Sequence, residues 1–353
     1  MKKKILIGMS GGVDSSVAAA LLAEQGYEVT GVTLRLWSEN TPGAAACNAS
    51  REAEDARKVC ARLGIPHLVL DRQDAFCEHV IGYFIEEYRR GRTPNPCVAC
   101  NRHIKFGEML RYALENGFDG VATGHYAEVA SLPNGRLSLR RASGIQKDQS
   151  YVLYSLSQEQ LSRLHFPIGE LPKEQVREKA RSLGLAVHSK PDSQEICFIP
   201  DHDYAAFLQR SGVSLPGEGN FISQNGEILG RHGGIWRYTV GQRKGLGVSF
   251  GRPMFVLGID SDSNTVTLGE AGSEFSSSLT VRDINWMALP EPSSPITAEA
   301  KLRYSAVPAP ARITPLGGGR ARLDFDSPVR AGTPGQAAVF YDGQLLLGGG
   351  IIE

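Results

Sequence analysis

The sequence has few of the features that mark secreted or membrane proteins. Six cysteines in 353 residues are too few for a disulfide framework to hold so long a chain together. No apolar run is long enough to span a membrane, and the apolar stretch after the amino-terminal lysines is too short for a signal peptide. We therefore expect a cytoplasmic protein without a membrane partner.

The chain also lacks an excess of charge of either sign, since 38 lysines and arginines balance 38 aspartates and glutamates. A nucleic-acid partner would therefore need positive charge gathered at one place on the surface. Repeats and low-complexity tracts are absent as well. The 41% content of hydrophobic residues is enough for a substantial core, and the length predicts two or three domains.

The first half of the chain alternates short apolar segments with amphipathic ones. This alternation is typical of an α/β fold, a parallel sheet with helices on both faces. The expected strands are Lys4 to Gly8, Glu28 to Leu34, His67 to Leu70 and Gly120 to Thr123. The expected helices are Ser15 to Gln25, Ser50 to Leu63, a segment through Phe76 and Phe84 that ends near Gly91, and Lys173 to Gly184.

Two prolines follow the third of these helices. Each proline in the segment Arg92 to Pro96 disfavours helix in the residue before it, which predicts an extended loop. We expect this loop to deliver Cys97 and Cys100 on backbone that is not helical.

The composition changes after about Pro200. Glycine is frequent there, short segments alternate in polarity, and turn pairs such as Asn225-Gly226 occur, all of which favour β structure. We predict an α/β domain over residues 1–205, a small central domain over 206–275 and a C-terminal β-barrel over 276–353.

A turn rich in glycine and serine, Gly8 to Ser16, joins the first expected strand to the first expected helix. Free backbone N–H groups and the helix dipole attract an anion there, and glycines let the backbone close on phosphates. The turn lacks both the lysine of G-x-x-x-x-G-K-[ST] and the spacing of G-x-G-x-x-G, which argues against kinase-type transfer and dinucleotide binding. The alternative is a plain capping turn without a ligand.

Three of the cysteines form a pattern of their own. Cys97 and Cys100 make a C-x-x-C pair, and Cys197 lies far downstream. A close pair is typical of a redox or a metal site, whereas a lone third cysteine could simply be buried.

Several motifs, in this order, resemble those of one family. Ser10 to Ser15 reads S-G-G-x-D-S and resembles the PP-loop of ATP pyrophosphatases, which cleave ATP between the α and β phosphates. With the segments that follow, the chain resembles the tRNA-specific 2-thiouridylase (MnmA) family over nearly its whole length. Those segments are Asn95 to Phe106, Thr123 to Ala127, Lys147 to Tyr151, Ser193 to Ile199, Tyr238 to Gly247 and the glycine-rich strand after Gln336.

The resemblance implies a tRNA-uridine 2-sulfurtransferase that uses ATP and Mg²⁺ to thiolate the wobble uridine of tRNAs for Glu, Gln and Lys. It implies that Cys100 is the nucleophile and that Cys197 carries a persulfide from a donor protein. The implied ATP contacts are Gly8, Met9, Ser10, Gly11, Gly12, Val13, Asp14, Ser15, Leu34 and Gly124, with Asp14 also positioning magnesium. The implied contacts to the target base and the tRNA are Asn95, Pro96, Cys97, His125, Lys147, Asp148, Gln149, Arg303, Tyr304 and Gln336. We expect a monomer in the absence of tRNA.

Some of these positions have simpler explanations. Arg303 and Tyr304 could be an ordinary exposed strand pair, His125 an oriented core histidine, and Asp14 a partner of the helix dipole. Some relatives carry an aspartate where Cys97 stands, which puts in doubt any mechanism that needs a carboxylate at this position.

The chemistry explains the need for ATP. A pyrimidine C2 carbonyl is a poor electrophile, and adenylation of O2 makes AMP the leaving group. The persulfide sulfur on Cys197 then attacks C2 directly, or Cys100 attacks it, releasing sulfide and forming a transient Cys100–Cys197 disulfide. Positive charge from Arg102 and Lys105 should lower the pKa of Cys100. The alternative is a [4Fe-4S] cluster held by Cys97, Cys100 and Cys197, with one open iron position.

Other classes of protein share parts of this pattern. A PP-loop ligase that adenylates a small carboxylate has no need of the three cysteines. A non-enzymatic RNA-binding protein with an ATP switch would keep its function in a Cys100→Ser variant. A PP-loop tRNA thiolase that acts on a different base is a closer competitor, and the modified base distinguishes it.

Overall fold

The computed structural model describes residues 2–38, 41, 49–142, 147–191, 196–330 and 332–353. The chain divides into two compact units. The first consists of Met1–Val80, Cys97–His202 and Gln344–Leu346, and the second of Ile81–Pro96, Asp203–Gly343 and Leu347–Glu353.

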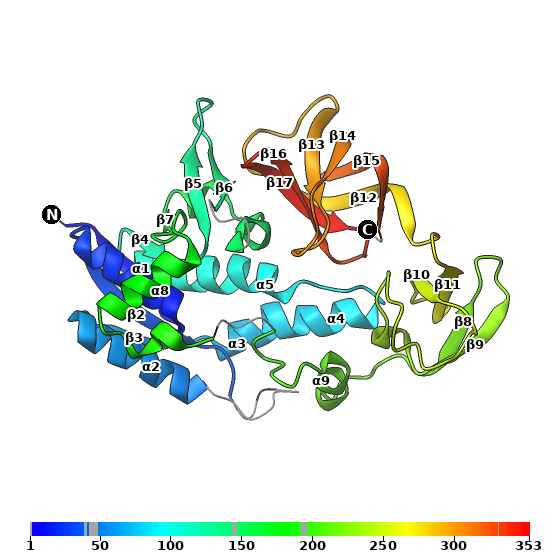
Figure 1. Cartoon of the computed structure of the whole chain (residues 1–353), viewed down its shortest axis with the longest axis horizontal. Coiled ribbons are helices and arrows are strands. Elements are labelled where there is room, and N and C mark those ends of the chain that lie inside the picture. Colours follow the sequence, from blue (N-terminus) through cyan, green and yellow to red (C-terminus); the bar gives the residue numbers. More distant parts are fainter. Residues whose placement is uncertain (1, 39–40, 42–48, 143–146, 192–195, 331) are drawn as a thin grey trace. The chain divides into compact units, whose positions relative to one another are not determined.

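A parallel sheet with the strand order β3-β2-β1-β4-β7 forms the centre of the first unit (Figure 1). Its strands are β1 (Lys4–Gly8), β2 (Glu28–Arg35), β3 (His67–Asp71), β4 (Gly120–Ala122) and β7 (Leu164–His165). The four expected strands are therefore confirmed. Ile5, Leu6 and Ile7 of β1 are all fully buried. Because successive side chains of a strand point to opposite faces, protein covers both faces of this sheet.

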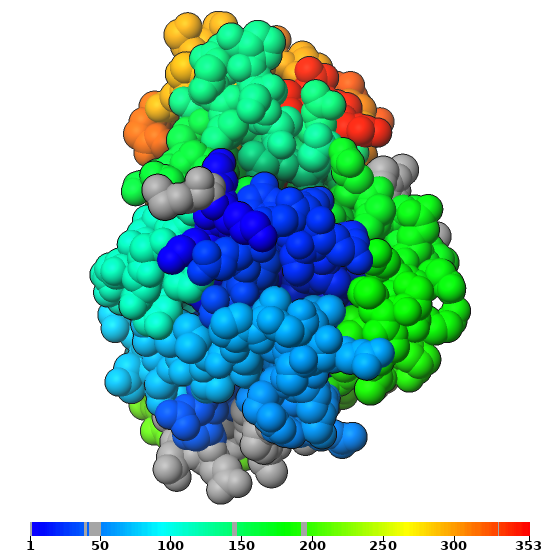
Figure 2. All heavy atoms as spheres, turned by 90° about the vertical axis from the view of Figure 1, so that its left-hand side faces the viewer, coloured from blue at the N-terminus to red at the C-terminus, as the bar shows by residue number. Residues whose placement is uncertain are grey.

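The helices of the first unit pack around this sheet. They are α1 (Val13–Glu24), α2 (Ala49–Leu63), α6 (Met109–Glu115), α7 (Gln158–Leu161), α8 (Lys173–Ser182) and the 3₁₀ helices η4 (Ser150–Leu153) and η5 (Ala186–Ser189), with a hairpin of β5 (Ala127–Ser131) and β6 (Leu137–Arg141). Helices α1 and α8 pack against each other, and Figure 2 shows the surface around α8, in green, adjoining that of the amino-terminal segments, in blue. Val17 and Leu22 of α1 share a core with Val176 of α8.

A continuous helical segment follows β3 in the chain. It consists of α3 (Gln73–Phe76), the π-helix η1 (Cys77–Gly82) and α4 (Tyr83–Arg89), which confirms the helix expected through Phe76 and Phe84. Residues 92–95 after it form neither helix nor strand, which agrees with the predicted loop.

The two cysteines that follow lie on a helix, so the prediction that they lie on non-helical backbone is wrong. Pro96 is the first residue of α5 (Pro96–Ala99), which continues into the π-helix η2 (Cys100–Glu108) and then into α6. Proline suits the first turn of a helix, because its missing N–H has no partner to lose there and its φ is already helical. The second proline therefore ends the loop and begins a helix.

The side chain of Gln160 contacts two carbonyl groups of η2. The side-chain amide of Gln160 donates to the carbonyl of Phe106 at 2.7 Å and to that of Arg102 at 3.3 Å. A side chain that inserts into the helical hydrogen-bond ladder can widen a helix, and π-helical turns are frequent at functional sites.

The second unit is rich in β structure. It contains a sheet of the order β10-β11-β8-β9 and a barrel of the order β12-β15-β14-β13-β16-β17, which is closed by pairing of β12 with β17. Its elements are α9 (Tyr204–Arg210), β8 (Gly219–Ile222), β9 (Ile228–His232), η6 (Ile235–Arg237), β10 (Met254–Asp260), β11 (Thr265–Glu270), β12 (Phe275–Trp286), β13 (Ile296–Lys301), β14 (Ala309–Gly317), β15 (Arg320–Arg330), β16 (Ala337–Asp342) and β17 (Leu345–Ile352). The expected C-terminal barrel is confirmed. None of the helices within the described ranges has the length and apolar character needed to cross a membrane.

Candidate active site

The turn between β1 and α1 leaves the start of the helix open to a ligand. Gly12 precedes the helix, and no side chain caps it among the described residues. The hydroxyl of Ser16 donates to the carbonyl of Gly12 at 2.7 Å, and Ser15 Oγ lies 3.2 Å from Ser10 Oγ. The backbone N–H groups of the first turn and the positive end of the helix dipole therefore point to where an anion can bind.

Two glycines are needed for this turn to close. Gly11 has a φ of +66°, and a Cβ there would lie 2.6 Å from the carbonyl oxygen of Glu52 in α2. A Cβ on Gly124, just after β4, would lie 2.6 Å from the backbone nitrogen of Ser15. The predicted ATP contact Gly124 thus lies directly against the turn, and neither glycine can be replaced without displacing backbone.

Asp14, in the first turn of α1, belongs to a small polar cluster. Its Oδ1 accepts hydrogen bonds from the hydroxyl of Tyr126 at 2.7 Å and from the ammonium of Lys173 at 2.6 Å. The side chain of Lys173 is only 8% exposed, and a lysine is rarely so buried without an ionic partner. The structure therefore places a buried cation beside the turn.

A second lysine lies against the same turn. The ammonium of Lys190 donates to the carbonyl of Gly11 at 2.9 Å and to Oδ2 of Asp55 at 3.0 Å. Two ammonium groups from distant segments therefore contact the turn, and both are suited to a phosphate ligand.

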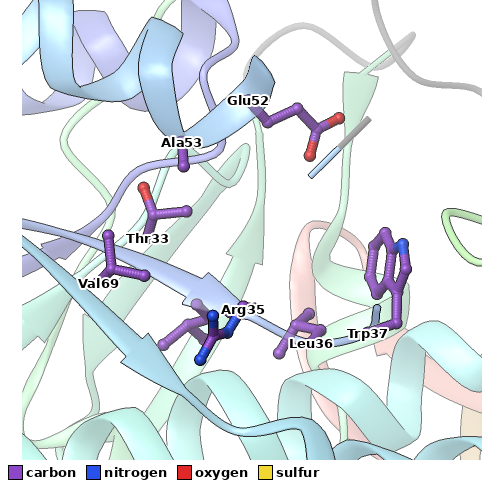
Figure 3. Close-up of a pocket in the computed structure, with 8 residues that line it drawn as sticks. Thr33, Arg35, Leu36, Trp37, Glu52, Ala53 and Val69 are labelled. Atoms are coloured by element: carbon purple, nitrogen blue, oxygen red, sulfur yellow. The ribbon is translucent and has the colours of Figure 1, made fainter. Parts of the chain in front are cut away.

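A cavity of about 250 Å³ lies at the carboxyl end of β2 (Figure 3). Its walls are mostly apolar, and Figure 3 shows Trp37 and the carboxylate of Glu52 at the same end of it. The volume is slightly below that of pockets for drug-sized ligands, so it suits one part of a nucleotide, such as the base. The residues that line it are Thr33, Leu34, Arg35, Leu36, Trp37, Glu52, Ala53 and Val69, which include the predicted ATP contact Leu34.

The thiols of Cys97, Cys100 and Cys197 lie within electrostatic range of one another. Cys100 is buried, whereas Cys97 and Cys197 are exposed. Burial raises the pKa of Cys100 to about 11. The surrounding protein also raises the pKa of Cys97 and that of Cys197, although both residues reach solvent.

The prediction that nearby positive charge gives Cys100 a lowered pKa is wrong. The ammonium of Lys105 does act to lower the pKa of all three thiols, but the effect of burial is larger. Arg102 is exposed and is not among the groups that shift the pKa of Cys100. In this conformation Cys100 is therefore a thiol at neutral pH.

The three thiols do not form a ligand set in this conformation. Within the described ranges, no group of three or more histidine, cysteine, aspartate or glutamate side chains is arranged to hold a metal ion. A persulfide relay needs only two of the three cysteines. Ser193, Gln194 and Glu195, which precede Cys197 in its motif, lie outside the described residues.

His125 is a buried, neutral histidine. Its Nδ1 lies 2.7 Å from Oγ1 of Thr123, and its ring packs against Phe106 and Phe166. Burial, followed by the charge of Lys105, lowers its pKa well below the usual value. These contacts agree with the simpler explanation of a core histidine, and its contact with tRNA stays a prediction.

The segment Lys147 to Gln149 is held by its own side chains. Asp148 is buried and accepts hydrogen bonds from the backbone N–H of Ser150 at 3.0 Å and from its hydroxyl at 3.1 Å. Gln149 Oε1 accepts from the backbone N–H of Tyr126 at 3.0 Å. Lys147 is partly exposed, so its ammonium is the group of this segment best suited to a phosphate.

The remaining predicted tRNA contacts lie in the second unit. The guanidinium of Arg303 donates to the carbonyl of Val240 at 3.0 Å, and the ammonium of Lys301 lies 5.5 Å from the centre of the Tyr304 ring, which is exposed. Gln336 is partly exposed and lies just before β16.

Lys173 and Lys190 are the residues of this site that sequence reasoning missed. Lys173 was expected only as the first residue of a helix. A cation at that end of a helix opposes the dipole, and this unfavourable placement was a signal that a carboxylate compensates it. For Lys190 no comparable signal exists in the sequence.

The fold and the glycine-rich turn together define a nucleotide-binding α/β domain that is joined to β-rich domains. Comparison with known families agrees with this class. The profile described as tRNA methyl transferase HUP domain matches residues 3–201, the tRNA methyl transferase PRC-barrel domain matches 205–270, and the aminomethyltransferase beta-barrel domain matches 276–352.

Relatives match over the full length of the chain. The tRNA-specific 2-thiouridylase MnmA of Acetivibrio thermocellus is 50% identical, with 100% of this chain and 99% of the relative covered. The protein of the same name in Clostridioides difficile is 48% identical over 100% of this chain and 99% of its own length. That of Desulfitobacterium hafniense is 50% identical over 99% of this chain and 98% of its own length. The chain therefore belongs to the tRNA-specific 2-thiouridylase family.

Proposed function

We propose that this protein thiolates the wobble uridine of tRNAs for Glu, Gln and Lys at C2. It does so by adenylating O2 with ATP and replacing that oxygen with sulfur carried on cysteine. The products are 2-thiouridine, AMP and pyrophosphate. The observation that carries this proposal is the gathering of three thiols in the same unit that holds the phosphate-binding turn. Full-length identity to proteins named tRNA-specific 2-thiouridylase supports the choice of substrate.

The first step uses the turn and the cavity. The base of ATP lies in the cavity lined by Leu34, and its β and γ phosphates lie on the N–H groups at the start of α1. Uridine O2 attacks the α phosphorus, the bond to the β-phosphate oxygen breaks, and pyrophosphate leaves. Lys173 and Lys190 offset the negative charge that develops on the leaving group. A magnesium ion bound with ATP would neutralise phosphate charge, and Asp14 is the carboxylate that would hold it.

The second step uses the cysteines. A donor protein leaves a persulfide on Cys197, which is accessible because it is exposed. In one version the terminal sulfur attacks C2 and AMP leaves, after which Cys100 attacks the sulfur of Cys197 and frees the thiolated base. In the other, Cys100 attacks first and releases sulfide, which then attacks C2. Both versions end in a Cys100–Cys197 disulfide, and a thiol reductant must return two electrons before the next turnover.

We also propose which residues contact the tRNA, where the domains begin and end, and where the protein acts. Lys147 contacts a tRNA phosphate, and Asn95, Pro96 and Cys97 meet the target base. The domains are residues 1–205, 206–275 and 276–353, and the limits of the three matching profiles support these boundaries. The protein acts in the cytoplasm as a monomer that binds tRNA and a persulfide donor.

Reconstitution tests the proposal. Unmodified tRNA for Glu is incubated with the protein, ATP, magnesium, a cysteine desulfurase, L-cysteine and a thiol reductant. Pyrophosphate and 2-thiouridine are measured together. Cys100→Ser and Cys197→Ser should still release pyrophosphate as the tRNA is adenylated, but should form no thiolated base. Cys77→Ser is the matched control, because Cys77 is a partly buried thiol that does not act on the pKa of the other three, and it should retain activity. Thiolation by Cys100→Ser at the wild-type rate would refute the relay.

One further measurement distinguishes the persulfide relay from the alternative of an iron–sulfur cluster. The protein is purified without oxygen, and iron and sulfide are determined. An active protein free of iron, in which Cys97→Ser retains thiolation, supports the relay. Stoichiometric iron that is lost together with thiolation in Cys97→Ser would overturn it in favour of a cluster.

A further inference from the structure

The segment Arg92–Pro96, here called the strap, is held by residues from two distant parts of the chain. It begins after Gly91, whose φ is +69° and where a Cβ would lie 2.3 Å from Cγ2 of Ile259 in β10. The reversal of the chain after α4 is therefore packed closely against the central sheet of the second unit. The strap and all the residues that hold it belong to this unit.

Thr93 is bound on both its backbone and its side chain. Its N–H donates to the carbonyl of Pro334 at 2.8 Å. Its hydroxyl lies 2.9 Å from that of Thr239, in the motif Tyr238 to Gly247. The first contact comes from the turn before β16 of the barrel and the second from the central domain, so the strap is fixed from two directions.

Gln336 adds two further hydrogen bonds to the strap. The two hydrogens of its side-chain amide serve two successive strap carbonyls, that of Thr93 at 2.8 Å and that of Pro94 at 3.2 Å. Its own backbone is held in the barrel, since its carbonyl accepts from the N–H of Ile352 at 2.9 Å. Gly335 permits this approach, because it has a φ of +90° and a Cβ there would lie 2.9 Å from the carbonyl oxygen of Thr93.

Arg303 secures the two segments that hold the strap. Its guanidinium donates to the carbonyl of Val240 at 3.0 Å and to the hydroxyl of Thr333. The hydroxyl of Thr333, which is 1% exposed, donates to the same carbonyl of Val240 at 3.1 Å. The neighbours of Thr239 and of Pro334 are thereby tied to each other.

The strap leads directly into the helix that carries two of the thiols. Pro96 is its last residue and the first of α5, and Cys97 follows. Prolines 94 and 96 restrict the backbone between the anchored Thr93 and this helix, so that a displacement at Thr93 is transmitted along the chain rather than absorbed.

We propose that Gln336, with Arg303 behind it, is a positioning residue for sulfur transfer. The amide of Gln336 fixes the strap, and with it Asn95 and Pro96, which the proposed function assigns to the target base and which directly precede Cys97 in the chain. These two side chains therefore act on the reaction through the strap, which differs from the direct tRNA contact that the family resemblance implies. The proposal rests on the proposed function.

The experiment compares Gln336→Met with Gln209→Met in the full-length protein. Methionine keeps the volume of glutamine but removes both donated hydrogen bonds, and Gln209 is an exposed residue of α9 in the same unit. Hydrogen exchange at the amide of Thr93 is measured without tRNA or ATP, followed by tRNA affinity and single-turnover thiolation. We expect exchange at Thr93 to accelerate about tenfold in Gln336→Met only, since a net hydrogen bond contributes about that factor. Thiolation should fall at least tenfold while the Kd for tRNA stays within about twofold of wild type.

Thr93→Val provides an independent variant, because it removes the bond to Thr239 without touching Gln336. It should reproduce the loss of thiolation with unchanged tRNA affinity. Unchanged exchange at Thr93 in Gln336→Met, together with a weaker Kd for tRNA, would overturn the proposal and make Gln336 a direct RNA contact. The exchange measurement uses no substrate, so a failure of the proposed function would show separately, as a wild-type protein that makes no 2-thiouridine.

Discussion

Burial and charge compete at Cys100, and the balance between them sets how this residue can react. Burial raises its pKa to about 11, while Lys105 acts in the opposite direction. At pH 7 only about one molecule in 10⁴ would carry the thiolate at such a pKa. In the proposed mechanism, formation of the thiolate is therefore a step that the site must assist, and the charge of Lys105 acts in that direction.

Lys105→Met should slow sulfur transfer and shift its pH dependence upward. Only the thiolate reacts, and below the pKa of Cys100 the fraction of thiolate rises about tenfold per pH unit. The rate of sulfur transfer therefore rises with pH until the pKa is reached. Without the ammonium the pKa rises further, and less thiolate exists at any given pH. Single-turnover thiolation from pH 6.5 to 9.5 measures this, with Lys105→Arg as the variant that keeps the charge. If the pH profiles of thiolation for Lys105→Met and wild type coincide, Lys105 does not influence the reactivity of Cys100.

Lys173→Met should slow pyrophosphate release at least tenfold, because one of the two ammonium groups beside the turn is lost. Lys179→Met is the control, since Lys179 lies on the same helix and forms a more exposed ion pair with Glu24 at 2.8 Å. Pyrophosphate is measured with saturating tRNA, and thermal unfolding shows whether each variant is folded. If the folded Lys173→Met protein turns over normally, its ammonium has no part in the ATP step.

The part of this site that lies in one continuous segment of the chain could be identified from the sequence. The turn Gly8 to Ser16 is a continuous motif, and its glycines, serines and carboxylate can be interpreted without knowledge of the fold. The two lysines could not be found in this way, because Lys173 lies 159 residues from Asp14 and Lys190 lies 179 residues from Gly11. The pKa of Cys100 was misjudged for a related reason, since charge is visible in a sequence and burial is not.

For helices and strands, each prediction was right or wrong according to how proline and hydrophobic periodicity were interpreted. Strands β1 to β4 of the parallel sheet were found because buried strands are nearly continuous apolar runs. The two-residue strand β7 was not predicted. Residues 92–95 were correctly predicted to form a loop. The helix that begins at Pro96 was missed, because proline was treated only as a residue that ends helices, although it also suits the first helical position.

Gly124→Ala should disturb the phosphate-binding turn. The added Cβ would lie 2.6 Å from the backbone nitrogen of Ser15, so the first turn of α1 must shift. We expect a loss of stability of about 1–3 kcal/mol, as for other overpacked sites, and a raised KM for ATP. Gly217→Ala is the control, because nothing lies within 4 Å of a Cβ at that position. Thermal unfolding and ATP titration measure both effects, and an unchanged KM would show that Gly124 does not shape the nucleotide site.

At the scale of the whole molecule, the balanced charge requires RNA binding to depend on local cations. The order of the α/β domain and the barrel could be predicted from composition and turn signals, and the barrel is confirmed. The assignment of residues 81–96 to the second unit could not be predicted. It depends on long-range contacts such as the one between Thr93 and Gln336, which are 243 residues apart.

Lys147→Ala should weaken tRNA binding and reduce its salt dependence. A lysine that contacts a phosphate releases a counterion, so its loss lowers the slope of log K against log salt by about one. The Kd for tRNA is measured from 50 to 300 mM salt, and ATP binding without tRNA serves as the internal control. An unchanged slope would place Lys147 outside the RNA contact.

The central claim is that this protein places sulfur at C2 of the wobble uridine. It is tested most directly by mass spectrometry of tRNA nucleosides from a strain in which its gene is deleted. We predict that 2-thiouridine derivatives disappear from tRNAs for Glu, Gln and Lys, while 4-thiouridine is unchanged. The wild-type gene should restore them, and the Cys100→Ser gene should not. Loss of 4-thiouridine with normal 2-thiouridine would contradict the account and assign the protein to a different class of tRNA thiolase.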